Sequence, residues 1–349
     1  MDSLTHALSG ALLAQAAAPR TSRPDALSPK ARLAAGFAAA AFPDCDFALR
    51  LVDTLAYLNW HQGITHSLML MPAWAWVLAK LFLRISRGRY NWRAFYVVAM
   101  LGIAIHIAGD LVTAYGTMLF APFSEQCYSI PLVFVIDPYL TALVAAGFAM
   151  AAIHPHSRRT AVVSLLLALT YVGLLANLHL RARDLGREYA AIHRIDGGAI
   201  HALAQPLSPS NWKVIVSDSE GYHETHVNLW RRDAGSLPEE AGGLHEIFHA
   251  YRPASMLEWR RHPRFGDDPA YAPIAREAWS RVEFEPFLRF ALFPVLDAVQ
   301  KDTAELCAWF YDLRFSVPTL APSFSYGMCR GGSSGHWRLV RRHGALWID

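Results

Sequence analysis

The sequence predicts an α-helical polytopic membrane domain of about six transmembrane or re-entrant helices, followed by a C-terminal α+β extramembrane domain. Three observations lead to this fold class: a high apolar content, an uneven distribution of charge, and an alternation of basic loops. Of the 349 residues, 53% are apolar and 17% are charged, whereas soluble domains average about 25% charged residues. The net charge of +3 is too small to suggest a nucleic-acid-binding protein, and four cysteines in 349 residues are too few for a disulfide scaffold.

Charge divides the chain near residue 180. Residues 1–180 carry 12 Lys+Arg and 8 Asp+Glu, which is 11% of that range. Residues 181–349 carry the other 20 and 21, which is 24%. We therefore expect a membrane-embedded domain over 1–180 and a water-soluble domain over 181–349.

Six apolar stretches indicate the membrane helices of the first domain. The last two have roughly the 20 residues that a bilayer requires, whereas the first two are short and rich in Ala and Gly, so they either span by packing on neighbours or are re-entrant. A cleaved signal peptide is the alternative for the first stretch, but no basic residue precedes it. The stretches are Leu4–Ala18, Leu33–Phe42, Leu68–Leu83, Ala94–Ile107, Leu132–Ile153 and Ala161–Leu180.

Basic residues alternate between the connecting loops. Ten lie in 20–32, 84–93 and 154–160, and the other connections, 43–67 and 108–131, contain only Arg50. By the positive-inside rule the first three loops face the cytoplasm. A multi-pass protein of the inner membrane follows, with its N-terminus and its C-terminal domain outside the cytoplasm.

The C-terminal domain shows short elements of both types. We expect helices over Arg181–His201, Pro269–Arg281 and Pro286–Val299. The strands expected from alternation or β-forming residues are Trp212–Ser217, Tyr222–Trp230, Leu306–Phe315, Phe324–Cys329 and His336–Arg341.

Carboxylates and imidazoles of the membrane half gather at one depth. On the topology above, nearly all of them lie at the outer ends of the apolar stretches. Polar residues are costly in a membrane and are therefore candidates for function. The set consists of Asp2, His6, Asp44, Asp46, His61, His66, His106, Asp110 and Asp137.

These side chains are metal ligands by type. Imidazole nitrogens and carboxylate oxygens bind zinc, and also manganese or iron. His106 and Asp110 are four residues apart, which places both on one face of a helix. Because several acidic groups at one depth would repel each other, we expect a divalent cation, zinc first, with more than one ion compatible with so many ligands. Each motif alone also has a structural interpretation: a hydrogen-bonded helix pair, a helix cap at Asp44, Asp46 or Asp137, or a core histidine at His6.

As an ordered set, these motifs resemble a known family. Asp2-x-x-Thr5-His6, Pro43-Asp44-x-Asp46, His61-x-Gly63-x-Thr65-His66-Ser67, His106-x-x-x-Asp110 and Asp137 are similar to those of the YdjM/YbcI/YfhP-type inner-membrane proteins, which are described as membrane-bound metal-dependent hydrolases. The sequence departs from the family pattern at Gln62, where Arg is expected, at Gly109, where an apolar residue is expected, and at Cys45 inside the PDxD motif. Loss of the Arg matters if it holds a substrate phosphate.

The resulting hypothesis is metal-dependent hydrolysis at the outer membrane boundary. The favoured ligands are His6, His61, His66, His106 and Asp110, while Asp44, Asp46 and Asp137 bridge metals or complete the shell. Asp2, or whichever of Asp44 and Asp46 is not a ligand, could orient the attacking water as a catalytic group. The partners expected are the lipid bilayer and an amphiphilic substrate, for example a phosphoester or phospholipid, and no nucleic acid.

Two alternatives remain open. In one, the metal only ties helix ends together and the C-terminal domain binds a partner. In the other, His245-Glu246-x-x-His249 is the HExxH motif of a metalloprotease, although a surface helical turn also explains it. His223 and His226 are expected at the surface, on opposite faces of a strand. Cys307 and Cys329 fall on neighbouring predicted strands and could pair.

Overall fold

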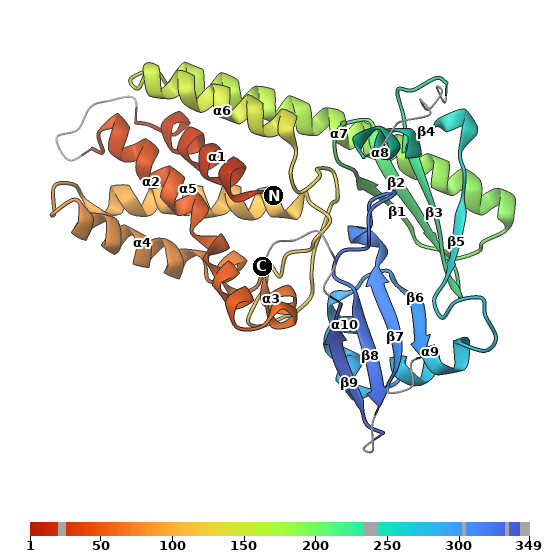
Figure 1. Cartoon of the computed structure of the whole chain (residues 1–349). Helices are drawn as coiled ribbons and strands as arrows, with labels where there is room; N and C mark the ends of the chain where they lie inside the picture. Colours follow the sequence, from red (N-terminus) through yellow and green to blue (C-terminus); the bar gives the residue numbers. More distant parts are fainter. Residues whose placement is uncertain (20–25, 234–242, 302–304, 332–334, 343–349) are drawn as a thin grey trace. The chain divides into compact units, whose positions relative to one another are not determined.

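The chain divides into two compact units. The computed structural model describes residues 1–19, 26–233, 243–301, 305–331 and 335–342. The units are Met1–Asn177 and Leu178–Asp349, and the long helix α7 (Arg158–His193) contributes to both. The first unit is helical, and the second combines two sheets with short helices (Figure 1).

Several helices of the first unit begin at residues whose side chains cap them. Asp2 accepts a hydrogen bond from the backbone N of Thr5 at the start of α1, and Asp137 accepts from the first turn of α6, whose first residue is Pro138. Besides the start of α7, the unit contains α1 (Ser3–Ala16), α2 (Pro29–Ala41), the 3₁₀ helix η1 (Pro43–Leu51), α3 (Thr54–Trp60), the 3₁₀ helix η2 (Ile64–His66), α4 (Met71–Ile85), α5 (Trp92–Leu111) and α6 (Pro138–Ile153).

Close helix crossings bring the polar ends together. A Cβ on Gly10 of α1 would lie 2.6 Å from the carbonyl oxygen of Gly36 in α2, so only glycine allows this approach. α1 also packs against α5 and α6, and α5 packs against α2 and α4 (Figure 1). The start of α1, the end of α2 and the end of α5 therefore meet.

Fewer helices than six are long and apolar enough to cross a membrane on their own. Among the described residues, α5 and α7 meet that condition, and α3–η2 with α4 forms a pair bent by 78° that would make a third span or a re-entrant loop. α6 is apolar but has 16 residues. α1 and α2 have 14 and 13 residues, about 20 Å each, against about 30 Å of hydrocarbon. The expectation of six spans is thus not confirmed, and two to three candidate spans are established.

The second unit contains two sheets. In the first, β2 pairs antiparallel with β1 and β3, and β3 also pairs with β5 and, in parallel, with β4; the second is the antiparallel meander β6-β7-β8-β9. The strands are β1 (Ile200–Ala204), β2 (Asn211–Ser217), β3 (Gly221–Asn228), β4 (Arg252–Pro253), β5 (Arg260–Pro263), β6 (Pro294–Lys301), β7 (Glu305–Asp312), β8 (Tyr326–Gly331) and β9 (Trp337–Arg341). The helices are α8 (Leu244–Ala250), α9 (Ala272–Trp279) and α10 (Glu285–Phe290), with 3₁₀ turns η3 (Ala254–Met256), η4 (Val282–Phe284) and η5 (Leu313–Phe315).

An α+β unit was predicted and is found, with corrections in detail. The helix expected over Pro286–Val299 is wrong in its second half, because α10 ends at Phe290 and β6 begins at Pro294. The helix expected from Arg181 is the end of α7, which stops at His193, and Ile200 opens a strand. Gly186 of α7 faces Ile200 and Val214, so this end of the helix covers one face of the first sheet.

Candidate metal centre

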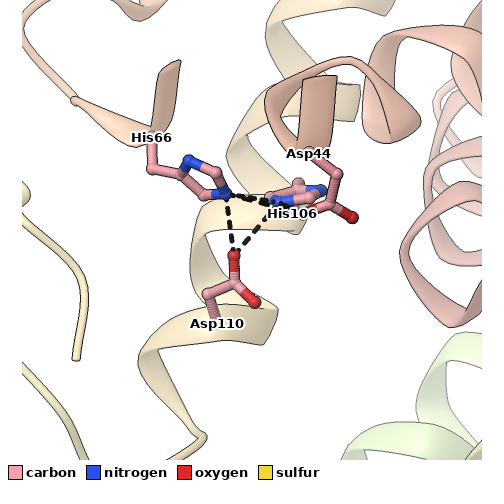
Figure 2. A group of neighbouring side chains, drawn as sticks. All are labelled: Asp44, His66, His106 and Asp110. Atoms are coloured by element: carbon pink, nitrogen blue, oxygen red, sulfur yellow. Dashed lines mark hydrogen bonds and ion pairs between the residues drawn. The ribbon is translucent and has the colours of Figure 1, made fainter. Parts of the chain in front are cut away.

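Four side chains from three separate segments point toward one another in the first unit. Asp44 lies in η1, His66 ends η2, and His106 and Asp110 lie one turn apart on α5 (Figure 2). One potential ligand atom from each lies within 4.8 Å of every other. His66, His106 and Asp110 are completely buried, and Asp44 is partly accessible.

The distances within this group are short. The two Nε2 atoms of His66 and His106 are 2.9 Å apart, and they lie 3.1 Å and 3.0 Å from Oδ2 of Asp110. Oδ1 of Asp44 lies 3.8 Å from the first Nε2 and 3.5 Å from the second. Ligand atoms around a tetrahedral ion with bonds of about 2.1 Å are about 3.4 Å apart, so the observed separations bracket that value.

Hydrogen bonds on the far side of each ring make Nδ1 the protonated nitrogen, so each histidine in its neutral form presents an unprotonated Nε2 to the group. Nδ1 of His106 lies 2.6 Å from the carbonyl oxygen of Ala40, which can only accept, so Nδ1 carries the hydrogen. Nδ1 of His66 lies 2.9 Å from the hydroxyl of Thr65, and that hydroxyl donates to Asp46 at 3.1 Å. The hydroxyl must therefore accept from His66. Such contacts are typical of the partners that orient histidine ligands.

The four converging atoms are consequently all electron-pair donors. Two neutral imidazole nitrogens face each other and two carboxylate oxygens, an arrangement that is repulsive without a positive charge between them. Oδ2 of Asp110 has no hydrogen-bond donor. A proton could bridge two of the atoms, whereas a metal ion can contact all four, so the residues present fit a divalent cation.

His6 lies beside this group. Its ring stacks on that of His106 with centroids 3.7 Å apart, and its Nε2 lies 3.0 Å from Oδ1 of Asp110. The amino group of Met1 also donates to Oδ1 at 2.5 Å. A Cβ on Gly109 would lie 2.9 Å from the His6 ring. The glycine that departs from the family pattern thus makes room for His6.

Asp46 and His61 form a pair next to the group. Nδ1 of His61 lies 2.8 Å from Oδ1 of Asp46, whose other oxygen accepts from the backbone N of Gln62 and from Thr65. The His61 and His66 rings meet edge to face at 5.7 Å. Asp46 therefore already has three hydrogen-bonding partners and supports the histidines instead of joining the four-residue group.

Asp2 and Asp137 serve as helix caps in the structure. Both carboxylate oxygens of Asp2 accept from Thr5. Asp137 accepts from the backbone N of Tyr139 and Leu140, and from the hydroxyl of Tyr171. Neither carboxylate is among the four converging ligands, so the capping interpretation describes their contacts.

Gln62 fills the position where a cationic side chain was expected. Its amide oxygen accepts from Thr117, and it is buried. The side chain is neutral and engaged, so it offers no charge to a substrate phosphate. Cys45, inside the PDxD motif, is an exposed free thiol.

The second unit does not assemble the alternative protease site. His245 and Glu246 are exposed on α8, which has only seven residues. Among the residues that the structure describes, no third ligand joins His245 and His249 to form a close group, whereas zinc proteases use three protein ligands. Cys307 and Cys329 face each other on β7 and β8 and form a disulfide bond, as considered above.

The second unit contains a buried ionic cluster that was not predicted from the sequence. Nζ of Lys213 donates to the carbonyl oxygens of Leu313 and Ser316 at 2.6 Å and lies 3.0 Å from Glu224. Glu224 also lies 2.8 Å from His262 and 3.5 Å from His226. The cluster ties the first sheet to the segment after β7. The signal was the charged residue at 213 within the otherwise apolar run 212–216.

Burial and charge set the pKa values in this cluster. Burial by itself raises the pKa of Glu224, but the Lys213 ammonium and His262 hold it well below its usual range. Burial and then Lys213 lower the pKa of His226 to about 3. The surface position expected for His226 and His223 is wrong: they lie on opposite faces, but only 17% and 14% of their side chains are exposed.

Comparison with known proteins identifies the helical unit. The family model of the YdjM inner membrane protein matches residues 1–181. The uncharacterized protein YfhP of Bacillus subtilis (strain 168) is 28% identical over 142 residues, which is 40% of this chain and 43% of that protein, so less than half of the relative is covered. No solved structure matches. The chain belongs to the YdjM inner membrane protein family, and the match contains all four residues of the candidate centre.

Proposed function

We propose that the protein is a membrane-bound metal-dependent hydrolase whose ion is held by Asp44, His66, His106 and Asp110. The observation that carries the proposal is the convergence of two imidazole nitrogens and two carboxylate oxygens in a buried site, with Nδ1 of each histidine hydrogen-bonded outside the group. Two nitrogens and two oxygens suit zinc best, with manganese or iron as alternatives.

A divalent cation here would act as a Lewis acid that makes water a stronger nucleophile and polarises the scissile group. The chain supplies the proton acceptor. Asp46 fixes Nδ1 of His61 as the protonated nitrogen, which leaves Nε2 free to accept a proton from water. We therefore propose that His61 acts as the proton acceptor and not as the metal ligand expected from the sequence. Asp46 then orients the His61 ring and does not contact the attacking water itself. Asp44, the most accessible of the four ligands, lies on the open side of the site.

The surroundings of the site favour an amphiphilic substrate. Exposed apolar side chains crowd the segments that carry Asp44, Asp46, His61 and His66, namely Phe47, Leu49, Leu51, Val52, Trp60 and Ile64. Such a collar suits contact with acyl chains or with the bilayer. The alternation of basic loops favours six membrane crossings, with this end of the helical bundle at the outer face of the inner membrane. From the apolar surroundings of the site we propose a phosphoester or phospholipid as the substrate class.

The first experiment measures metal in the purified protein. Wild type should carry zinc or another divalent metal in at least one equivalent per chain, and Asp110→Asn should lose it while still inserting. Asp137→Asn should retain metal, because asparagine caps a helix as well as aspartate does. His245→Ala should also retain it. Metal that persists in Asp110→Asn but disappears in His245→Ala would reject the proposed centre in favour of the protease motif.

The second experiment tests hydrolysis. Wild-type protein in detergent should cleave bis(p-nitrophenyl) phosphate or phospholipid vesicles in a metal-dependent way, and His61→Gln should keep metal but lose activity. The competing function is a purely structural centre. It would show full metal content in the wild type, a loss of thermal stability on chelation, and no turnover of any phosphoester.

A further inference from the structure

A basic pocket lies at the opposite end of α1 from the candidate metal centre. It has a volume of about 1170 Å³ and lies where the end of α1, the start of α2 and the turn between α6 and α7 meet. Gln15 lines it, nine residues after His6, or about 14 Å along the helix axis. The pocket is therefore separate from the metal centre. Its other polar side chains are Arg32, His156, Ser157, Arg158 and Arg159.

Two of the arginines are held in place by backbone carbonyls. Arg32 is 8% exposed and donates from Nη2 to the carbonyl oxygen of Leu27 at 3.0 Å. Arg158 donates from Nε and Nη2 to the carbonyl oxygen of Ala16 at 2.9 Å and 2.7 Å. A guanidinium has five N–H groups, so each keeps donors for another acceptor. Gln15 beside them is buried, and its Oε1 has no partner.

In the described part of the chain, the positive charges of the pocket lack a compensating carboxylate. The described residues that line the pocket include no Asp or Glu, and no described carboxylate pairs with Arg32, Arg158 or Arg159. The guanidinium groups of Arg32 and Arg158 lie close enough to repel each other. α7 begins at Arg158, so the positive end of its helix dipole adds to the same potential. A buried guanidinium in such a field is costly unless an anion completes the site.

We propose that this pocket binds the phosphate group of an anionic phospholipid. Fixed guanidinium forks match phosphate oxygens, and basic pockets at the ends of membrane helices hold lipid headgroups. The volume exceeds that of a phosphate ion, and Val162 and Val163, both exposed, form an apolar wall on α7 beside the basic residues. A headgroup on the arginines would place its acyl chains against this wall. Inorganic phosphate offers the same oxygens without the chains.

Native mass spectrometry of the full-length protein in detergent tests the proposal. Wild type should retain phosphatidylglycerol in preference to phosphatidylcholine at equal concentration. Arg159→Gln should reduce this retention at least about fivefold. It is the better variant, because Arg159 is exposed and makes no hydrogen bond or ion pair with the described residues, so its loss should not disturb folding. Arg32→Gln should reduce retention further, with thermal unfolding as the check on its fold.

Arg87→Gln is the matched control, since Arg87 is an exposed arginine outside the pocket, in another predicted cytoplasmic loop. It should bind phosphatidylglycerol as wild type does. Displacement of the lipid by millimolar inorganic phosphate would support the phosphate site but assign it to a soluble ligand. Equal retention of both lipids in wild type, or retention by Arg159→Gln and a folded Arg32→Gln equal to that by Arg87→Gln, would overturn the proposal.

Discussion

Replacing Thr65 by valine tests whether hydrogen bonds behind the histidines hold the metal centre together. The change keeps the shape of the side chain and removes one hydroxyl, which accepts from Nδ1 of His66 at 2.9 Å and donates to Asp46 at 3.1 Å. Each bond contributes about 0.5–1.5 kcal/mol net. Together they amount to about 1–3 kcal/mol, or about a 5- to 140-fold loss of metal affinity, a range that contains the usual effect of about 10- to 100-fold for partners that orient metal ligands.

The assay is a competition between metal-free protein in detergent and a fluorescent zinc chelator. Thr65→Val should bind zinc about 10- to 100-fold more weakly than wild type, with an unchanged number of sites at saturation. Thr170→Val is the matched control, because that exposed hydroxyl donates only to the carbonyl oxygen of Leu166 within α7. If Thr65→Val binds zinc within twofold of wild type, the inference that His66 is held by its Nδ1 hydrogen is refuted.

Three further predictions concern the rest of the chain. The Cys307–Cys329 bond should be present in cells if the second unit lies outside the cytoplasm; alkylation of both thiols without reductant would contradict that location. Reporter fusions after residues 88 and 157 should read cytoplasmic and a fusion after residue 120 external, and the same side for 88 and 120 would remove the shared depth of the site. His226 has its pKa lowered from 6.5 to about 3 in the folded state, so the free energy of unfolding should fall by about 1.4 kcal/mol per pH unit as the pH drops from about 6.5 toward about 3. The Tm difference of the full-length protein between pH 7 and pH 5 should shrink in His226→Gln but not in His245→Gln, and an unchanged difference would show that His226 is not the group.

The helical periodicity made part of the site predictable. His106 and Asp110 are one turn apart on α5, a geometry that follows from their spacing alone. The approach of Asp44 and His66 depends on η1, η2 and the packing of α2 against α5, which no local pattern encodes. The topology inferred from the basic loops placed these residues at the same depth in the membrane, and this was the indirect indication that their segments meet.

Local chemistry could not separate a capping carboxylate from a ligand. Asp2 and Asp137 each precede a helix, where an oxygen satisfies free N–H groups whether or not a metal is near. Only the three-dimensional contacts show that these oxygens are engaged. The strand β6 was not predicted because its conformation depends on non-local contacts. It follows α10 after only three residues, and its strand preference comes from pairing with β7.

The contacts of Asp312 and Asp137, two other buried carboxylates, give the strongest argument about Asp110. Asp312, also fully buried, accepts from the backbone N of Leu292 and from the backbone N and Nε of Arg314. Asp137 collects three donors in the same manner. Oδ2 of Asp110 has none, although burial makes an unpaired carboxylate oxygen expensive. It faces two imidazole nitrogens whose hydrogens are committed elsewhere. Imidazole nitrogens and carboxylate oxygens that converge at ligand spacing suit a cation, and this distinguishes Oδ2 of Asp110 from the carboxylates of Asp137 and Asp312, whose oxygens accept from N–H and O–H donors.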